Sequence, residues 1–135
     1  MIATGNFTTS NFIPAPVEPA APIETGLPVG VATMIKTFTG EIDGRASTIF
    51  VSAFDPSTGV GTYMALESFE GSIGGKTGAC NLLHVASTGG DDAYNQLFII
   101  VPASGTGELA GITGTGALSV GEDDAYTVTL DYSIV

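Results

Sequence analysis

The chain has 135 residues and a formal net charge of −11, from 14 acidic and 3 basic side chains. A hydrophobic content of 44% supplies enough apolar mass for one folded domain and excludes a chain that is disordered throughout. The negative charge repels phosphate backbones and anionic lipid surfaces, so we expect no nucleic acid and no membrane among the partners.

Residues 1–6 carry neither a basic start nor an apolar block, so we expect no signal peptide and a cytoplasmic location. No apolar run approaches the roughly 20 residues that span a bilayer. Cys80 is the single cysteine, which excludes an internal disulfide and a metal site built from several cysteines. We expect no metal and no cofactor.

Strand signals recur between glycine-rich or acidic turns, and no stretch has the apolar period of a long helix. The first predicted strand is Ile2 to Phe12. Residues 14–28 follow and contain five prolines, which excludes a central strand or a helix there. We expect a connection that either lies over the surface, across the mouth of a barrel, or is disordered.

Seven further strands are predicted, with short turns between them. In chain order they are Val29 to Thr39, Arg45 to Phe54, Gly61 to Gly71, Thr77 to Thr88, Ala93 to Val101, Ile112 to Val120 and Ala125 to Val135. Eight such strands predict one all-β domain over residues 1–135, an eight-stranded antiparallel up-and-down β-barrel or a sandwich. A barrel is favoured because closure leaves no exposed strand edge.

Alternation along each strand predicts which side chains point inward. The predicted inward set is Met34, Lys36, Phe38, Tyr63, Ala65, Glu67, Phe69, Cys80, Leu82, His84, Tyr94, Gln96, Phe98, Ile100, Tyr126, Val128, Leu130, Tyr132 and Ile134. The strand that contains Tyr63 is ambiguous, because Met64 and Leu66 on its opposite face are also apolar. The strand before Pro102 is also apolar on its other face, at Leu97, Ile99 and Val101. We therefore expect a partner subunit to cover it and the protein to be a homo-oligomer.

Several short motifs are specific when taken together. They are Lys36 to Gly40, Leu66-Glu67 with Phe69-Glu70-Gly71, Gly74 to Gly78, Leu82-Leu83-His84, Val101 to Gly111 and Leu130-Asp131-Tyr132. The set resembles the family of domain of unknown function 3224, which is grouped with allene-oxide-cyclase-like barrels. The resemblance implies an eight-stranded antiparallel barrel with a central cavity and no established reaction, although the wider superfamily includes cyclases of apolar substrates. The chain departs from the family pattern in residues 14–28 and at Cys80, whose small side chain would enlarge the cavity.

Lys36, Glu67 and His84 are the candidate catalytic residues because alternation places all three on inward faces. Paired in a dry cavity, they would have shifted proton affinities and could serve as acid or base. The alternative is a hydrogen-bonded polar plug that fixes strand register in a barrel filled by its own side chains. Tyr132, in the family-like ending, is the predicted catalytic hydrogen-bond donor.

A ligand in the cavity would contact inward aromatic and apolar side chains, although core packing is the alternative for each of them. The residues predicted to bind it are Phe38, Tyr63, Phe69, Cys80, Leu82, Tyr94, Phe98 and Tyr126.

Two further motifs resemble binding sites for a nucleotide and for calcium, but we expect neither site. Residues 105–110 match a dinucleotide fingerprint, but Gly111 and Gly114 leave no room for the helix that would hold a pyrophosphate. We expect a one-turn helix at residues 108–110 instead, capped by Ser104 or Thr106 and closing one end of the barrel. The acidic turns Asp91-Asp92 and Glu122-Asp123-Asp124 lack the ligand spacing of a calcium loop, so we expect them to be solvated.

The sequence leaves three functions open. The first is a barrel that binds an apolar or amphipathic small molecule and isomerises or cyclises it by excluding water and holding a reactive conformation. The second is a non-catalytic binding protein that uses the same cavity. The third is a structural or oligomeric barrel with a plugged interior, which would lack the solvent-reaching cavity that the first two require.

Overall fold

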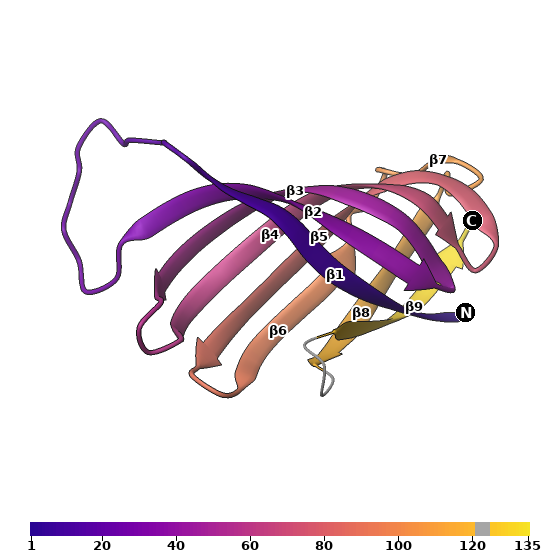
Figure 1. Ribbon diagram of the computed structural model, residues 1–135. Coiled ribbons are helices and arrows are strands. Elements are labelled where there is room, and N and C mark those ends of the chain that lie inside the picture. Colours follow the sequence, from indigo (N-terminus) through magenta and orange to yellow (C-terminus); the bar gives the residue numbers. More distant parts are fainter. Residues whose placement is uncertain (121–124) are drawn as a thin grey trace.

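The computed structural model is one sheet of nine antiparallel strands whose pairings close into a ring (Figure 1). The structure describes residues 1–120 and 125–135. The strands are β1 (Ile2–Ala15), β2 (Val29–Gly40), β3 (Ile42–Asp55), β4 (Val60–Ile73), β5 (Lys76–Gly89), β6 (Ala93–Ile100), β7 (Thr106–Gly107), β8 (Ile112–Val120) and β9 (Tyr126–Ile134). None of the described residues lies in a helix, so none lies in a helix long and apolar enough to cross a membrane.

Strands β1 to β6 pair in chain order, β6 then pairs with β8, and β9 pairs with both β8 and β1. The predicted all-β antiparallel fold is therefore confirmed. The predicted strand count of eight is one short, because the two-residue β7 pairs with β5 at Gly78 and Ala79 outside this cycle. The acidic turn predicted at Glu122-Asp123-Asp124 lies outside the described residues.

The predicted one-turn helix at residues 108–110 is wrong. Successive hydrogen bonds run instead from the amides of Leu109, Ala110 and Ile112 to carbonyls three residues earlier, which makes a chain of turns. Leu109 is fully buried among the core side chains, so this segment inserts into the interior. Ser104 caps no helix, because its Oγ accepts from the Asn81 amide at 2.9 Å and donates to the Val101 carbonyl at 2.6 Å.

Gly78 of β5 permits the close approach of this segment to the strand, and Gly105 permits the tight turn within it. A Cβ added at Gly78 would overlap the Thr106 carbonyl oxygen, and one added at Gly105 would overlap the Leu109 carbonyl oxygen. Glu108 adds a further link, since its Oε1 accepts from the Thr77 amide at 3.1 Å. The glycine-rich motif is thus explained by the packing of a turn against a strand, as expected of a segment that closes one end.

Alternation is confirmed along β2, β4, β5 and β9, where every second residue is buried over most of the strand. It is wrong at Tyr94 in the first half of β6, whereas Gln96, although exposed, lines a smaller hollow of about 160 Å³ with the inward residues Tyr63, His84 and Tyr126. The register against β5 shifts there: Leu97 is opposite Val85, but Tyr94 is opposite Ser87. The extra residue is a β-bulge around Asn95, whose φ is 52°, and it turns Tyr94 to the outside, where it is 49% exposed.

A second register shift lies in β1, between Ser10 and Ile13, where Asn11 has a φ of 55°. The strand continues beyond the predicted end to Ala15, with Pro14 opposite Ala32 in β2. Residues 16–28 contain no strand or helix and project past the ends of β1 and β2 (Figure 1). The proline-rich connection therefore extends away from the ring rather than across its opening.

Candidate functional site

The interior of the ring has a filled end and a hollow end. Apolar side chains from all around the sheet, with Leu109 among them, form the packed core of the filled end. A cavity of about 490 Å³ occupies the other end, beside the turn that joins β5 to β6. It is lined by Phe7, Thr9, Phe12, Met34, Lys36, Phe50, Ser52, Phe54, Tyr63, Ala65, His84, Thr88, Gly90, Asp91, Asp92, Ala93, Val120 and Tyr126.

A buried ion pair lies at the inner limit of the cavity. Lys36 Nζ is 2.9 Å from Glu67 Oε1, and their side chains are only 3% and 0% exposed. Thr48 Oγ1 donates to the same carboxylate oxygen at 2.7 Å, while Glu67 Oε2 is buried with no hydrogen-bond partner among the described residues. Lys36 Nζ also lies 4.6 Å from the centre of the Phe7 ring, an attractive cation–π distance.

The strand register brings this cluster together. Lys36, Thr48 and Glu67 come from the neighbouring strands β2, β3 and β4, with Thr48 directly opposite Glu67. All three side chains occupy the inward positions of their strands and are buried. An ion pair out of water is stable only when both partners remain, so each residue holds the other's charge in place.

His84 lies on β5, opposite Ala65 of β4 and Phe98 of β6. Its ring is buried, with the Tyr63 ring edge-on at 5.3 Å between centres. Burial lowers the pKa of His84 from 6.5 to about 4, and the positive charge of Lys36 adds to that effect. The imidazole is therefore neutral near pH 7 and presents one donor and one acceptor nitrogen.

Aromatic rings form much of the cavity wall. Phe7 stacks on Tyr126 at 5.0 Å between ring centres, and Phe50 stacks on Tyr63 at 5.3 Å. Burial, followed by the neighbouring Tyr126, raises the pKa of Tyr63 to about 12. The Tyr63 hydroxyl is accordingly protonated across the physiological range and can donate a hydrogen bond.

The structure brings together only part of the predicted site. Lys36, His84, Tyr63 and Tyr126 line the cavity, with Glu67 bonded directly to Lys36. The predicted ligand-binding residues that lie in the packed core instead are Phe38, Phe69, Cys80, Leu82 and Phe98. Tyr94 is the sixth predicted ligand-binding residue that does not line the cavity, because the β6 bulge turns it outward.

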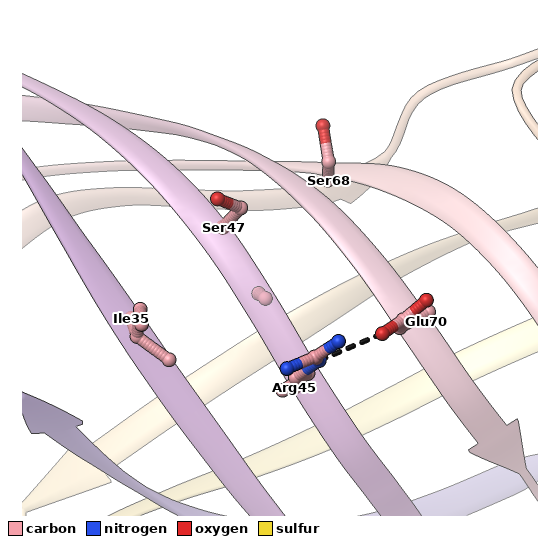
Figure 2. Close-up of a pocket in the computed structure, with 6 residues that line it drawn as sticks. Ile35, Arg45, Ser47, Ser68 and Glu70 are labelled. Atoms are coloured by element: carbon pink, nitrogen blue, oxygen red, sulfur yellow. Dashed lines mark hydrogen bonds and ion pairs between the residues drawn. The ribbon is translucent and has the colours of Figure 1, made fainter.

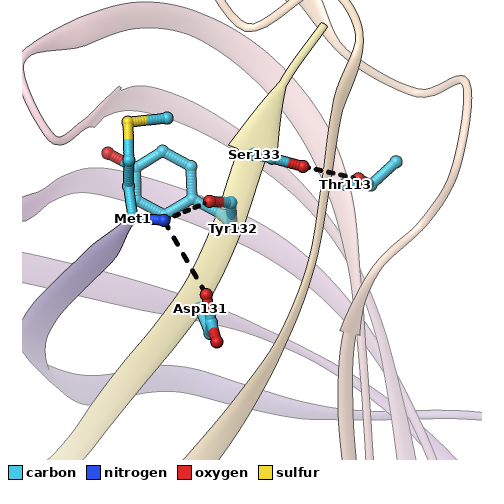
Figure 3. A network of polar contacts seen from close by, with 5 residues as sticks. All are labelled: Met1, Thr113, Asp131, Tyr132 and Ser133. Atoms are coloured by element: carbon cyan, nitrogen blue, oxygen red, sulfur yellow. Dashed lines mark hydrogen bonds and ion pairs between the residues drawn. The ribbon is translucent and has the colours of Figure 1, made fainter.

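Tyr132 and Cys80 are both placed away from the cavity. The Tyr132 hydroxyl lies against Gly74 in the turn between β4 and β5, where an added Cβ would overlap it. At the backbone of Tyr132, the amino group of Met1 donates to the carbonyl oxygen at 2.7 Å, and it lies 3.8 Å from Asp131 Oδ1 (Figure 3). Burial raises the pKa of the Cys80 thiol to about 11, which leaves it a packed core side chain in its protonated form.

Sequence reasoning missed several wall residues. Alternate positions of two strands supply most of them: Phe50, Ser52 and Phe54 in β3, and Phe7 and Thr9 in β1. The two-residue period of these strands could have predicted that their side chains face inward. Phe12 lies beyond the Asn11 irregularity, where simple alternation no longer applies.

Other parts of the described chain offer weaker sites. Residues 1–120 and 125–135 contain no cluster of three His, Cys, Asp or Glu side chains that could hold a metal ion. A hollow of about 410 Å³ on the outer wall is lined by Ile35, Arg45, Ala46, Ser47, Ser68 and Glu70 (Figure 2). Its charged groups, Arg45 and Glu70, satisfy each other at 2.7 Å and are exposed to water.

Comparison with known proteins relates the chain to a family of unknown function. The model of the family described as "Protein of unknown function (DUF3224)" matches residues 3–132. The chain is also similar to the crystal structure, at 1.84 Å resolution, of a protein of unknown function from the DUF3224 family of Shewanella oneidensis MR-1. The two are 27% identical, the match covers 100% of this chain and 97% of that chain, and the TM-score is 0.84. No curated protein matches the chain. A family match over nearly the whole length, supported by a solved relative with the same fold, places this chain in the DUF3224 family.

Proposed function

We propose that the protein binds an apolar or amphipathic small molecule in the interior cavity, within an eight-stranded barrel of the allene-oxide-cyclase-like kind. The observation that carries the proposal is the cavity of about 490 Å³ with aromatic walls and a buried Lys36–Glu67 pair. Small-molecule sites in proteins have volumes of about 300–1,000 Å³ and combine apolar walls with a few placed polar groups. An interior plugged along its whole length would offer no such space.

The charges around the cavity favour a neutral ligand. Glu67 balances the charge of Lys36, and Asp91 and Asp92 lie at the opening of a chain whose net charge is −11. An anion would meet repulsion at the opening and little net attraction inside. The Lys36 ammonium has three donor hydrogens and Glu67 Oε1 accepts one, so a ligand carbonyl, ether or hydroxyl oxygen could accept another.

Binding is tested with the neutral fluorescent probe N-phenyl-1-naphthylamine and two variants of β1. Thr9 lines the cavity opposite Lys36, so Thr9→Trp should fill the space and weaken probe binding by about tenfold or more. Thr8→Trp is the matched control, because the adjacent Thr8 is exposed on the outer wall. Its affinity should stay close to that of the unaltered protein. Equal affinities in both variants would place the bound probe outside the cavity.

Native mass spectrometry of the purified protein tests the same proposal without a chosen probe. A neutral small molecule that co-purifies with the unaltered chain and with Thr8→Trp, but not with Thr9→Trp, is the expected result. Retention of the molecule by Thr9→Trp would contradict binding in the cavity.

Cofactor-independent isomerisation or cyclisation of the bound molecule is the second candidate function. It is favoured by a neutral imidazole at the cavity wall and by Glu67 Oε2, which is buried and has no hydrogen-bond partner in the described part of the chain. His84 would move the proton, Lys36 would polarise a ligand oxygen, and Glu67 would act through Lys36 as a positioning residue.

The catalytic candidate predicts a loss of turnover in His84→Ala. Conversion of the co-purified molecule, followed by chromatography, should fall by about 10²–10⁴-fold, the usual contribution of a general acid or base. Probe affinity should change far less, since the aromatic walls remain. Unchanged conversion would remove His84 from the mechanism and leave binding as the function.

A further inference from the structure

The outer wall of the ring has two chemically different halves. On β8, β9 and β1 the outward positions are mostly hydroxyl and amide side chains: Thr113, Thr115, Ser119, Thr127, Thr129, Ser133, Thr4, Asn6 and Thr8. On β2 to β6 most of the central outward positions are apolar: Val31, Ile35, Ile49, Val51, Met64, Leu66, Leu83, Val85, Leu97 and Ile99. We call this second set the outer apolar face.

The outer apolar face is continuous across the strands. One row runs from Ile49 to Leu66, Leu83 and Ile99, each directly opposite the next. A second row joins Val51, Met64, Val85 and Leu97 in the same way. The most open members are Ile49, Leu66 and Leu97, at 55%, 49% and 47% exposure. A contiguous apolar surface of this kind is typical of an interaction site, whereas scattered exposed apolar residues are not.

We propose that the outer apolar face binds the same face of a second copy of this chain. Two copies that each carry −11 charges repel each other least where the facing surfaces hold no carboxylate, and neither row contains an ionisable residue. A basic protein would be drawn to the acidic residues outside this face instead, and an anionic membrane would be repelled.

The border of the face adds no net charge where it carries charged groups. Arg45 and Glu70 lie two outward positions beyond Ile49 and Leu66, in the lining of the hollow of Figure 2. Each copy pairs these two side chains at 2.7 Å, so this part of the border does not repel the same part of a second copy related by a two-fold axis.

The size of the face predicts a weak dimer. Its ten outward positions, each about 4.8 Å wide across the strands and about 7 Å long along them, give a face on the order of 340 Å² per copy. Standard stable interfaces bury about 800 Å² per partner, so we expect dissociation constants in the micromolar range or above.

Sedimentation velocity over a concentration series tests the proposal with two variants of equal charge. The unaltered chain should shift from monomer to dimer, and Leu66→Lys, at the centre of the face, should weaken association by about tenfold or more. Thr115→Lys, on the hydroxyl-rich half, is the control and should associate like the unaltered chain. Because each change adds a positive charge to an acidic protein, general electrostatics alone would strengthen association in both.

Three results would overturn the proposal. They are an unaltered chain that stays monomeric up to about millimolar concentration, equal association in Leu66→Lys and the unaltered chain, and a monomer whose face binds phosphatidylcholine vesicles in a flotation assay. If Leu66→Lys does not fold by circular dichroism, Leu97→Thr on the same face replaces it. The association of Leu97→Thr is then compared with that of Thr115→Lys, and equal association in the two variants would overturn the proposal.

Discussion

Replacing Lys36 with methionine is expected to lower the free energy of unfolding by about 3–5 kcal/mol. The substitution leaves the Glu67 carboxylate at 0% exposure with only the Thr48 hydroxyl to stabilise its charge. An uncompensated buried charge is among the largest single penalties a fold can carry. Urea unfolding at neutral pH, followed by circular dichroism, measures the loss.

The chain supplies a matched control for this prediction. Arg45 and Glu70 form a second cation–carboxylate pair at 2.7 Å, but their side chains are 73% and 62% exposed. Arg45→Met should therefore change the free energy of unfolding by no more than about 1 kcal/mol. A similar small change in Lys36→Met would mean that water reaches Glu67 and that the cavity has no dry inner wall.

The double variant Lys36→Met with Glu67→Gln separates the pair from its parts. A neutral amide can still accept the Thr48 hydrogen bond, so most of the lost stability should return. The unaltered chain, the two single variants and the double variant together give the coupling free energy, which measures the interaction between the two side chains. Recovery would also argue that the pair is kept for its chemistry in the cavity rather than for stability.

The sequence predicts which ionisable groups face inward, because the two-residue period of β2, β4 and β5 is regular. That period places Lys36, Glu67 and His84 on inward faces, and their burial confirms it. The period fails at the Asn95 bulge, where one additional residue reverses the faces and turns Tyr94 outward. No residue type in that stretch marks the position of the bulge, since asparagine is equally common in turns.

The extent of the cavity could not be predicted from alternation. A period of two says which side of the sheet a residue faces, but not at which height in the ring it lies. Phe38 is two residues from Lys36 and faces the same way, yet it lies in the packed core while Lys36 borders the cavity. That boundary depends on how far Leu109 and its turn insert from one end, which is a property of the tertiary structure.

Acidification is expected to destabilise the protein through His84. Its pKa is about 4 in the folded chain and near 6.5 when exposed, so the unfolded state takes up a proton that the folded state refuses. Folding favours the neutral imidazole. The contribution of His84 to the free energy of unfolding is therefore present in full above pH 6.5, and it is lost as the pH falls toward 4. A shift of this size corresponds to about 3 kcal/mol between the two ends of that window.

The measurement is unusually direct because the chain has one histidine. Nuclear magnetic resonance of its imidazole should show a single titration with a midpoint near pH 4. The fall in unfolding free energy between pH 6.5 and 4 should be smaller by about 3 kcal/mol in His84→Gln, which cannot titrate there. Carboxylates elsewhere titrate alike in both proteins, so the difference isolates His84.

Lys36 links this prediction to the first one. Its charge is the second cause of the lowered pKa, after burial, so Lys36→Met should raise the His84 midpoint without restoring it to 6.5. An imidazole that titrates near 6.5 in the unaltered chain would be in contact with bulk water. The cavity would then be an open, wet recess, in which neither a neutral ligand nor a proton transfer gains from a low dielectric constant.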